Sequence, residues 1–342
     1  MNMKRTSTII SLLACLLMCG IPARAQFKIV DEQDGKPVAG AYVFSSTGKL
    51  LCISDADGKI KKLDGTVTIS NLSYEPKSVD AAKTTGIVYM QQKAYTLPEV
   101  TVGKADYVKL SGAFRDICRN DGKTILYREG LMDFYINTAS GKIKRRVRAC
   151  RQYEARGIRK IINFNIALLG EAQSTDLARI KYIKRDTISA VSGDTTFYKS
   201  THRGKTSDDA IMYIDTHREG VYRHIIDNTK YRTNINPMLT VHTNLCDWTY
   251  SSKAETWSTL VSFRSVYNYD YKPLPTKNFI AAEEMRDFVV TGVNTLGKEQ
   301  ADKEMKDKSE TADFTLPDCL PALPYDVAKE TQGLEQKKFW EM

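Results

Sequence analysis

Several motifs are missing from this chain of 342 residues, and each absence removes a class of function. The sequence has no GxSxG, no glycine-rich phosphate loop and no GxGxxG, so the common serine hydrolases and nucleotide-binding folds have no local support. None of the four histidines is followed three residues later by Glu, which leaves no His-x-x-Glu pair of the zinc carboxypeptidase kind. We therefore predict no catalytic residue, no cofactor and no metal ligand.

Cysteine is also scarce. Seven cysteines occur, two of them in the first 25 residues, and no C-x-x-C pair is formed. The other five are widely and irregularly spaced, at Cys52, Cys118, Cys150, Cys246 and Cys319. An odd number at such spacing does not indicate a disulfide framework in a chain this long, and it contains no zinc or redox motif. We expect buried free thiols.

A transmembrane helix is not indicated either, because no apolar run reaches roughly 20 residues. The N-terminus instead resembles a secretory signal peptide. Lys4-Arg5 precede the short apolar run Ile9 to Met18, and Ala23-Arg24-Ala25 supplies a small-x-small cleavage pattern. We expect residues 1–25 to be removed and the mature chain to begin at Gln26. The alternative is a lipoprotein, because Leu12-Leu13-Ala14-Cys15 loosely matches a bacterial lipobox.

Charged residues are plentiful but nearly balanced. Without residues 1–25 the chain has 47 basic and 41 acidic side chains, a net charge of +6 against +9 for the whole sequence. This balance suits a solvated envelope protein and does not indicate nucleic-acid binding. The remaining 317 residues can bury a substantial core and predict about two domains.

The first domain is predicted at residues 26–93, where short runs rich in Val and Ile alternate with turn residues every eight to twelve positions. This spacing is typical of an antiparallel β-sandwich. The runs are FKIV, AYVF, LLCI, KIKKL, VTISNL and GIVYM. Tight reversals are expected at Asp34-Gly35 and at Asp55-Ala56-Asp57-Gly58.

The same segment resembles a known family. The matching residues are Val30-Asp31, Gly35, Pro37, Val38, Gly40, Ala41, Val43, Ser54-Asp55, Gly58, Ile60, Val67 to Ser70 and Tyr74-Glu75. In order and spacing they are similar to the carboxypeptidase-regulatory-like domain, a prealbumin-like β-sandwich found at the N-terminus of many exported Gram-negative envelope proteins. The resemblance implies an accessory module without catalytic residues.

A linker is predicted at residues 94–104. The resemblance continues into this linker as far as residue 103. There the segment Leu97 to Val102 (LPEVTV) is similar to the one that joins the same sandwich to the plug of TonB-dependent receptors. Only about 240 residues follow, which is too few for the roughly 22 strands of a receptor barrel. TonB-dependent transport is therefore not predicted.

Residues 105–316 predict a larger β-rich domain. A helix is expected over residues 105–119, because Tyr107, Leu110, Phe114 and Ile117 recur every three or four positions. Runs rich in β-branched and aromatic residues then predict strands. These strands are expected at Ile125 to Ile136, Lys142 to Tyr153, Ile180 to Ile188, Thr196 to Ser200, Ile211 to Asp215, Val221 to Ile226 and Thr256 to Tyr271. Consecutive hairpins of this kind imply a curved antiparallel sheet with flanking helices.

Residues 317–342 are expected to form a proline-rich segment and then a helix from Tyr325 to Trp340. The predicted fold class is therefore mainly β with some α.

Two side-chain patterns also lead to expectations. Tyr267, Tyr269 and Tyr271 alternate on one face and are either core or a carbohydrate platform, whereas Glu283-Glu284 is expected to be solvated.

The strongest charge pattern is a basic run at residues 142–160, which has nine basic side chains and one acidic one. If the run is a strand, Lys144, Arg146 and Arg148 project from one face, because side chains alternate. One interpretation is a cationic patch for anionic lipid, glycolipid or an acidic envelope protein. The other is an exposed strand whose charges prevent edge-to-edge pairing. Arg145 falls on the apolar face and needs a carboxylate partner.

The leading hypothesis is a non-enzymatic exported protein of the Gram-negative periplasm or outer membrane, whose β-rich domain binds another envelope component. The alternative is a periplasmic carrier or sensor that holds an apolar or lipid ligand in a half-barrel-like cavity. The two differ in whether residues 105–330 contain an open hydrophobic cavity. A deep polar pocket that gathered His202, His217 or His224 with carboxylates would favour an enzyme instead.

Overall fold

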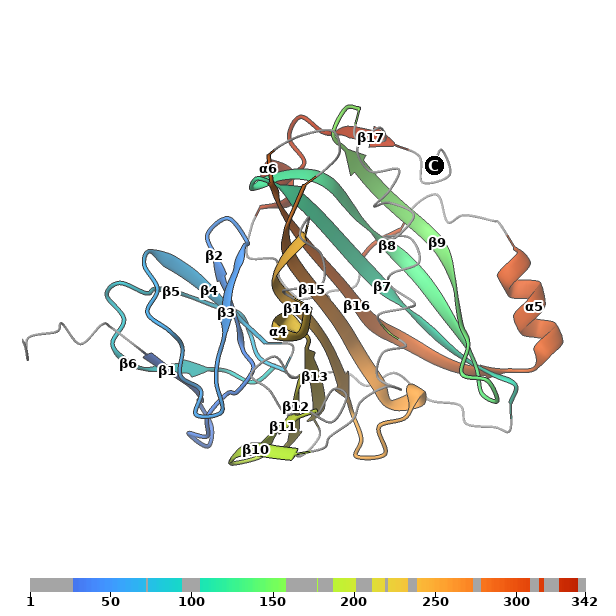
Figure 1. The fold of residues 1–342 in the computed structure, drawn as a ribbon. Helices are drawn as coiled ribbons and strands as arrows, with labels where there is room; N and C mark the ends of the chain where they lie inside the picture. Colours follow the sequence, from blue (N-terminus) through green and yellow to red (C-terminus); the bar gives the residue numbers. More distant parts are fainter. Residues whose placement is uncertain are drawn as a thin grey trace, which may run out of the picture.

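The computed structural model describes residues 27–71, 73–93, 105–157, 177, 187–200, 211–218, 221–232, 239–272, 278–307, 314–316 and 326–337. Within these ranges the chain is mainly β, as predicted, and its strands form three sheets (Figure 1). No helix in the described ranges is long and apolar enough to cross a membrane. The predicted signal peptide and the linker at 94–104 lie outside the described residues.

The N-terminal segment is a β-sandwich. Its two-stranded parallel sheet pairs β1 (Phe27–Asp31) with β6 (Gly86–Met90). Its second sheet has the order β3-β2-β4-β5 and consists of β2 (Tyr42–Ser45), β3 (Leu50–Ile53), β4 (Thr66–Ser70) and β5 (Lys77–Asp80). Ile29 and Val88 from the first sheet pack against Val43, Val67 and Ile69 from the second. The predicted sandwich is confirmed, but the expectation that it is antiparallel throughout is wrong for the β1–β6 pair. Its family membership stays a prediction.

One predicted strand of the sandwich is wrong. In the run KIKKL only Ile60 is buried, and Lys59 makes a single isolated bridge to Lys28. The turn before it needs glycine, because Gly58 has φ 74° and a side chain there would collide with the Ile29 carbonyl oxygen. The sequence pattern missed β5, whose one apolar residue is Val79.

The larger domain is built on a sheet of eleven strands in the order β10-β11-β12-β13-β14-β15-β16-β7-β8-β9-β17, with antiparallel neighbours. The strands are β7 (Tyr107–Asn120), β8 (Lys123–Asn137), β9 (Ile143–Glu154), β10 (Thr187–Ser192), β11 (Thr195–Lys199), β12 (Met212–Arg218), β13 (Val221–Asp227), β14 (Leu239–Tyr250), β15 (Leu260–Tyr271), β16 (Ile280–Leu296) and β17 (Glu335–Lys337). Two meanders, β10 to β16 and β7 to β9, join where β16 pairs with β7. Figure 1 shows a strongly twisted and curved sheet, which confirms the predicted architecture.

Both faces of this sheet are covered near its centre. One face, here called the aromatic face, carries the buried side chains of Phe134, Trp248, Phe263 and Phe288. The rings of Phe134 and Phe288 meet edge to face, with 4.8 Å between their centroids. The opposite face is called the sandwich face, because side chains such as Ile225 pack there with residues of the sandwich.

The helix expected over residues 105–119 is wrong, because these residues form β7. Leu110 and Phe114 lie on the aromatic face, whereas Ile117 packs on the sandwich face. A strand that is buried on both faces loses the simple alternation of apolar and polar residues. The apolar residues of β7 happen to fit a helical spacing.

The helix expected from Tyr325 to Trp340 is also wrong in its extent. The short helix α6 (Val327–Glu330) begins at Asp326, whose side chain accepts a hydrogen bond from the Ala328 amide at 2.9 Å. Gly333, at φ 82°, then turns the chain out of the helix. The residues that follow form β17, which pairs with β9.

A flanking helix, α5 (Lys298–Lys306), follows β16 directly. Its Ala301 is fully buried and packs with Tyr135 and Leu296 of the sheet. Lys109 on β7 donates to Glu304 of this helix at 2.6 Å. The helix is therefore anchored to the sheet by apolar packing around Ala301 and by the polar contacts of Glu304.

Candidate functional site

The sandwich docks on the larger sheet through a buried charged contact. Arg223 on β13 donates from Nη2 to the Gly40 carbonyl oxygen at 2.9 Å and to Asp247 Oδ2 on β14 at 2.6 Å. Tyr42 of the sandwich donates to the same carboxylate at 3.0 Å. Arg223 is 3% exposed and the other two side chains are 0% exposed, so this contact is shielded from water. Removing one partner would leave a buried charge uncompensated.

Apolar packing surrounds this contact. The cluster contains Ala39, Tyr42, Phe44 and Leu50 from the sandwich and Ile117, Tyr127, Ile225, Val266 and Met285 from the sheet. A second buried arginine, Arg264, lies 5.2 Å from the centre of the Tyr42 ring and donates to Asp287 at 2.6 Å. The sandwich and the sheet thus share one core.

The pKa shifts at this contact indicate a structural role for its charged side chains. Burial by itself lowers the pKa of Arg223, but the Asp247 carboxylate outweighs burial and raises it. The pKa of Tyr42 is raised well above its usual value, first by burial and then by the Asp247 charge. Neither side chain changes its charge near neutral pH. The contact therefore holds the two parts together and offers no acid or base.

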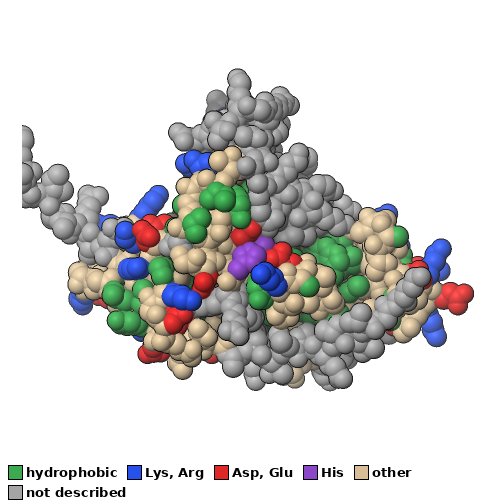
Figure 2. All heavy atoms as spheres, turned by 90° about the horizontal axis from the view of Figure 1, so that it is seen from below, with side chains coloured by type: hydrophobic (Ala, Val, Ile, Leu, Met, Phe, Trp, Pro, Cys, Tyr) green, Lys and Arg blue, Asp and Glu red, His purple; other side chains and the backbone are tan. Residues whose placement is uncertain are grey.

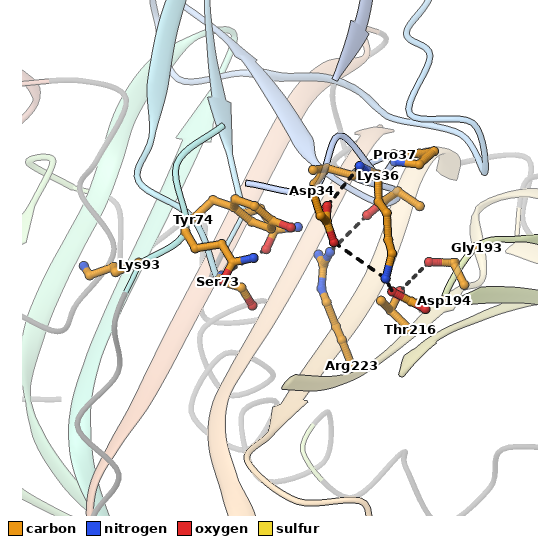
Figure 3. Close-up of a pocket in the computed structure, with 15 residues that line it drawn as sticks. Asp34, Lys36, Pro37, Ser73, Tyr74, Lys93, Gly193, Asp194, Thr216 and Arg223 are labelled. Carbon is orange, nitrogen blue, oxygen red and sulfur yellow. Dashed lines mark hydrogen bonds and ion pairs between the residues drawn. The ribbon is translucent and has the colours of Figure 1, made fainter. Parts of the chain in front are cut away.

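A pocket of about 610 Å³ lies beside this contact, between the sandwich and strands β10 to β13 (Figure 3). We call it the junction pocket. Its lining comes from the turn after β1, the loop before β5, the residues after β6 and the neighbouring edge of the larger sheet. The polar side chains that line it belong to Asp34, Lys36, Asn71, Ser73, Tyr74, Gln92, Lys93, Asp194, Thr195, Thr216 and Arg223.

An ion pair joins the two walls of the junction pocket. Lys36 Nζ lies 3.1 Å from Asp194 Oδ2 and 3.6 Å from Asp34 Oδ2 (Figure 3). Because the Lys36 side chain is 49% exposed, the pair contributes little to stability. Its single positive charge lies between two carboxylates, so the three groups together carry one net negative charge.

The remaining lining is largely neutral and polar. Thr195 and Thr216 share a hydrogen bond of 3.0 Å. Gln92 donates to Asp31 at 2.7 Å, and the buried Ser73 hydroxyl has no hydrogen-bond partner among the residues that the structure describes. Lys93 adds a half-buried ammonium group. The pocket can therefore offer donors and acceptors to a polar ligand.

Local turn chemistry places the two charged residues. Asp31 accepts a hydrogen bond from the Gln33 amide at 2.7 Å, which tightens the reversal after β1 around Gly35. This turn presents Lys36. The β10–β11 hairpin has a two-residue loop, Gly193-Asp194, with Gly193 at φ 53°, and this loop presents Asp194.

A second polar cluster lies where β12 and β13 meet the β14–β15 loop. His224 is 2% exposed, with Nδ1 2.6 Å from Asp215 Oδ1 and Nε2 2.9 Å from Glu255 Oε2. His217 Nε2 lies 4.0 Å from Glu255 Oε1. Figure 2 shows histidine and acidic side chains grouped on one face of the molecule.

This cluster gathers two of the histidines considered above with carboxylates, while His202 lies outside the described residues. None of its members lines the junction pocket. In the part of the chain that the structure describes, no group of three or more His, Cys, Asp or Glu side chains is placed to hold a metal ion. The cluster ties the β14–β15 loop, through Glu255, to the sheet.

The predicted cationic patch lies on β9, with its charges largely matched within the chain. Arg146 Nη2 lies 2.9 Å from Asp307, and Arg148 Nε lies 2.9 Å from Asp133. Lys144 is exposed. The structure brings acidic side chains to two of the three predicted residues, so the three do not present a row of solvent-facing charges.

The tyrosine stripe is partly core. Tyr269 is buried and donates to Glu284 at 2.7 Å, and its ring lies 4.4 Å from that of Tyr267. The expectation that Glu283-Glu284 is solvated is wrong for Glu284, which is 7% exposed and also contacts Arg286. Its placement on a central strand, β16, explains the difference.

Sequence reasoning did not find the junction pocket. The turn at Asp34-Gly35 is predicted, but nothing in the sequence pairs the adjacent Lys36 with Asp194, 158 positions away. The one available signal was the placement of Arg223 inside the strand predicted at Val221 to Ile226, because a charge on a strand that is buried on both faces needs a partner. That signal indicates a buried ion pair but does not reveal the pocket beside it.

Comparison with known proteins adds little. No family model matches the chain, and no curated protein matches its sequence. A solved structure titled for lipid–protein interactions in lipovitellin aligns with a TM-score of 0.29 and 8% sequence identity, covering 64% of this chain. The chain spans 27% of the length of that lipovitellin chain. A likeness at this level carries no argument about function.

Proposed function

We propose that this chain is a non-enzymatic, exported envelope protein that binds the glycan part of another envelope component in the junction pocket. The observation that carries the proposal is the pocket itself, which is walled by both the sandwich and the larger sheet. Its volume of about 610 Å³ lies within the range of small-molecule sites. The buried contact of Arg223 with Asp247 and Gly40 supports a site with fixed walls.

The chemistry of the lining suggests the ligand class. Lys36 lies between Asp34 and Asp194, which leaves one net negative charge, and Arg223 is matched by Asp247. The ammonium group of Lys93 offsets that charge, so the lining as a whole is neutral before a ligand enters. What remains is a set of hydroxyl and amide groups together with Lys93. Such a lining suits a neutral or singly anionic compound rich in hydroxyl groups, and it does not suit an apolar ligand.

The carrier of an apolar ligand, the alternative from the sequence, would place its ligand against the aromatic face. The described side chains of that face, such as Trp248, Phe263 and Phe288, are already buried. An apolar ligand would have to displace this packing. We therefore prefer the junction pocket as the binding site.

The proposal is tested by titrating the purified protein with neutral, carboxylated and phosphorylated oligosaccharides in a calorimeter. Lys93→Ala should lower the affinity for a bound oligosaccharide about tenfold, the loss expected for one charged hydrogen bond between the ligand and Lys93. Its thermal stability should stay nearly unchanged, because the Lys93 side chain is only half-buried.

Lys62→Ala is the matched control, because Lys62 is an exposed lysine of the sandwich whose contact is Asp64 at 4.0 Å. This variant should bind like the parent protein. Failure of every oligosaccharide to bind, or equal affinities of the two variants, would contradict the proposed function.

A further inference from the structure

The strand β10 ends the eleven-stranded sheet, and Figure 1 shows it at the outer edge of the molecule. Within the described residues, no strand pairs with its outer side. Its sequence, TISAVS, contains no charge and no proline. Natural edge strands avoid pairing with another chain through short length, bulges, charged residues or proline. The strand β10 is short and carries a bulge, but it lacks both charged residues and proline.

Two apolar side chains of β10 are unusually exposed. Ile188 is 60% exposed and Val191 is 65% exposed. In a regular strand these two positions would face opposite sides. The register shifts between Ile188 and Ala190, so Ile188 lies opposite Tyr198 and Val191 opposite Thr196. The bulge therefore places both side chains on the same face of the sheet.

The strand is complementary to itself when it is read in the reverse direction. In an antiparallel pair of two copies with the two-fold axis between Ser189 and Ala190, Ile188 of one copy faces Val191 of the other. Ser189 then faces Ala190. Apolar residues meet apolar residues, small residues meet small residues, and no like charges meet, because the strand has no charge.

We propose that two copies of this protein associate through β10, which pairs antiparallel with itself and joins the two sheets into one across a two-fold axis. Such an interface is isologous, since each copy contributes the same surface. The exposed stripe of Ile188 and Val191 is buried in both copies at once. The pair is short compared with a standard protein interface, so the association is concentration-dependent. This inference does not rest on the proposed glycan binding.

Sedimentation velocity of the full chain over a range of concentrations tests the dimer. The parent protein should sediment increasingly as a dimer as its concentration rises. Val191→Lys should weaken the dimer at least tenfold, because it places a charge opposite Ile188 of the second copy. The double variant Ile188→Glu, Val191→Lys should restore the dimer. The carboxylate introduced at position 188 of each copy then faces the ammonium group introduced at position 191 of the other copy, so two ion pairs form across the axis.

Phe279→Lys is the matched control, because Phe279 is an exposed apolar residue, 49% exposed, outside the edge strand. It should dimerise like the parent protein. Circular dichroism of each variant shows that the fold is retained. A parent protein that stays monomeric up to about 500 µM would overturn the proposal. So would a Val191→Lys variant that dimerises normally, or a double variant that stays as weak as the single one.

Discussion

Arginines buried in the larger sheet lie against carboxylates on the same or neighbouring strands. Arg128 donates to Asp116 at 2.6 Å, and Arg264 donates to Asp287 at 2.6 Å. Both pairs are directly opposite one another in the register of adjacent strands. A buried charge with a hydrogen-bonded partner is tolerated, whereas one that loses its partner costs about 3–5 kcal/mol. These pairs therefore fix strand register, and they place charges where a pattern of apolar residues would be expected.

Glycine at position 130 is required by the close approach of β8 and β9. A Cβ at Gly130 would overlap the Ala149 carbonyl oxygen and crowd the neighbouring backbone of β9. We expect Gly130→Ala to lower the free energy of unfolding by about 1–3 kcal/mol, since backbone atoms cannot move aside as a flexible side chain does. Urea denaturation measures the change.

Gly292→Ala provides the comparison for this glycine. Gly292 lies in β16, and a Cβ there would meet only the Ser111 Cβ, at the ordinary contact distance of 3.9 Å. Its substitution should not lower the free energy of unfolding, because Ala is at least as favourable as Gly within a strand. Equal effects of the two substitutions would show that β8 and β9 can separate without cost.

At the residue scale, the sequence could predict contacts within a turn but not contacts across the fold. The reversal around Gly35 follows from Asp31 and Asp34, which lie a few positions away. The partner of Lys36 in the junction pocket, Asp194, is 158 positions distant. Only the docking of the sandwich on the sheet brings them together, so a single sequence carries no local signal for the pocket.

At the scale of elements, the sequence predicted strands well where one face is exposed or where β-branched residues dominate. β8, β9 and β13 lie close to their predicted positions. β7 was mistaken for a helix, and β14 and β16 were missed, for one physical reason. All three strands have both faces covered, and their buried charges, such as Asp116, Asp247 and Asp287, interrupt the apolar runs.

The attachment of α5 to the sheet should depend on pH. Burial alone would raise the pKa of Glu304, but the hydrogen bond and the charge of Lys109 outweigh burial and lower it. A carboxyl group whose pKa is lowered by folding stabilises the folded state fully at a pH above its pKa in the unfolded chain, about 4.3. This stabilisation is lost as the pH falls through its pKa in the folded protein. The contribution is therefore present at pH 7.

We expect Glu304→Gln to lower the free energy of unfolding at pH 7 by on the order of 0.5 kcal/mol, because the pair is partly exposed. The difference from the parent should shrink as the pH falls below about 4. Urea denaturation from pH 7 to pH 3 measures both effects. A Glu304→Gln difference that is the same at both ends of this range would contradict the assignment.

At the scale of the whole molecule, the sandwich is more than an appended module. Its Tyr42 reaches Asp247 of the sheet, 205 positions away, and its Phe44 and Leu50 share a buried cluster with sheet residues. The composition of the sequence predicted two domains, and it could not predict that the two would share a core. That sharing rests on charges and apolar side chains whose partners are set only by the final arrangement.

The shared core leads to a prediction about cooperativity. We expect the sandwich and the sheet to unfold in one transition. If either part unfolded alone, water would reach the charged contact of Arg223 with Asp247 and the apolar cluster around it. Tryptophan fluorescence reports on the larger domain, because all three tryptophans follow the sandwich in the sequence and Trp248 is buried in the sheet. Hydrogen exchange of β2 and β4 peptides reports on the sandwich. The two urea midpoints should coincide in the parent protein.

Arg223→Ala should separate these midpoints. Without the guanidinium group, the buried Asp247 carboxylate keeps the hydrogen bond from Tyr42 but loses its counter-charge, at a cost of about 3–5 kcal/mol. The sandwich should then exchange at lower urea than the sheet unfolds. Arg156→Ala is the control, because Arg156 is 93% exposed and its substitution should leave both midpoints unchanged. Two separate midpoints in the parent protein would mean that the docked sandwich folds as an independent unit, and the walls of the junction pocket would then be free to move apart.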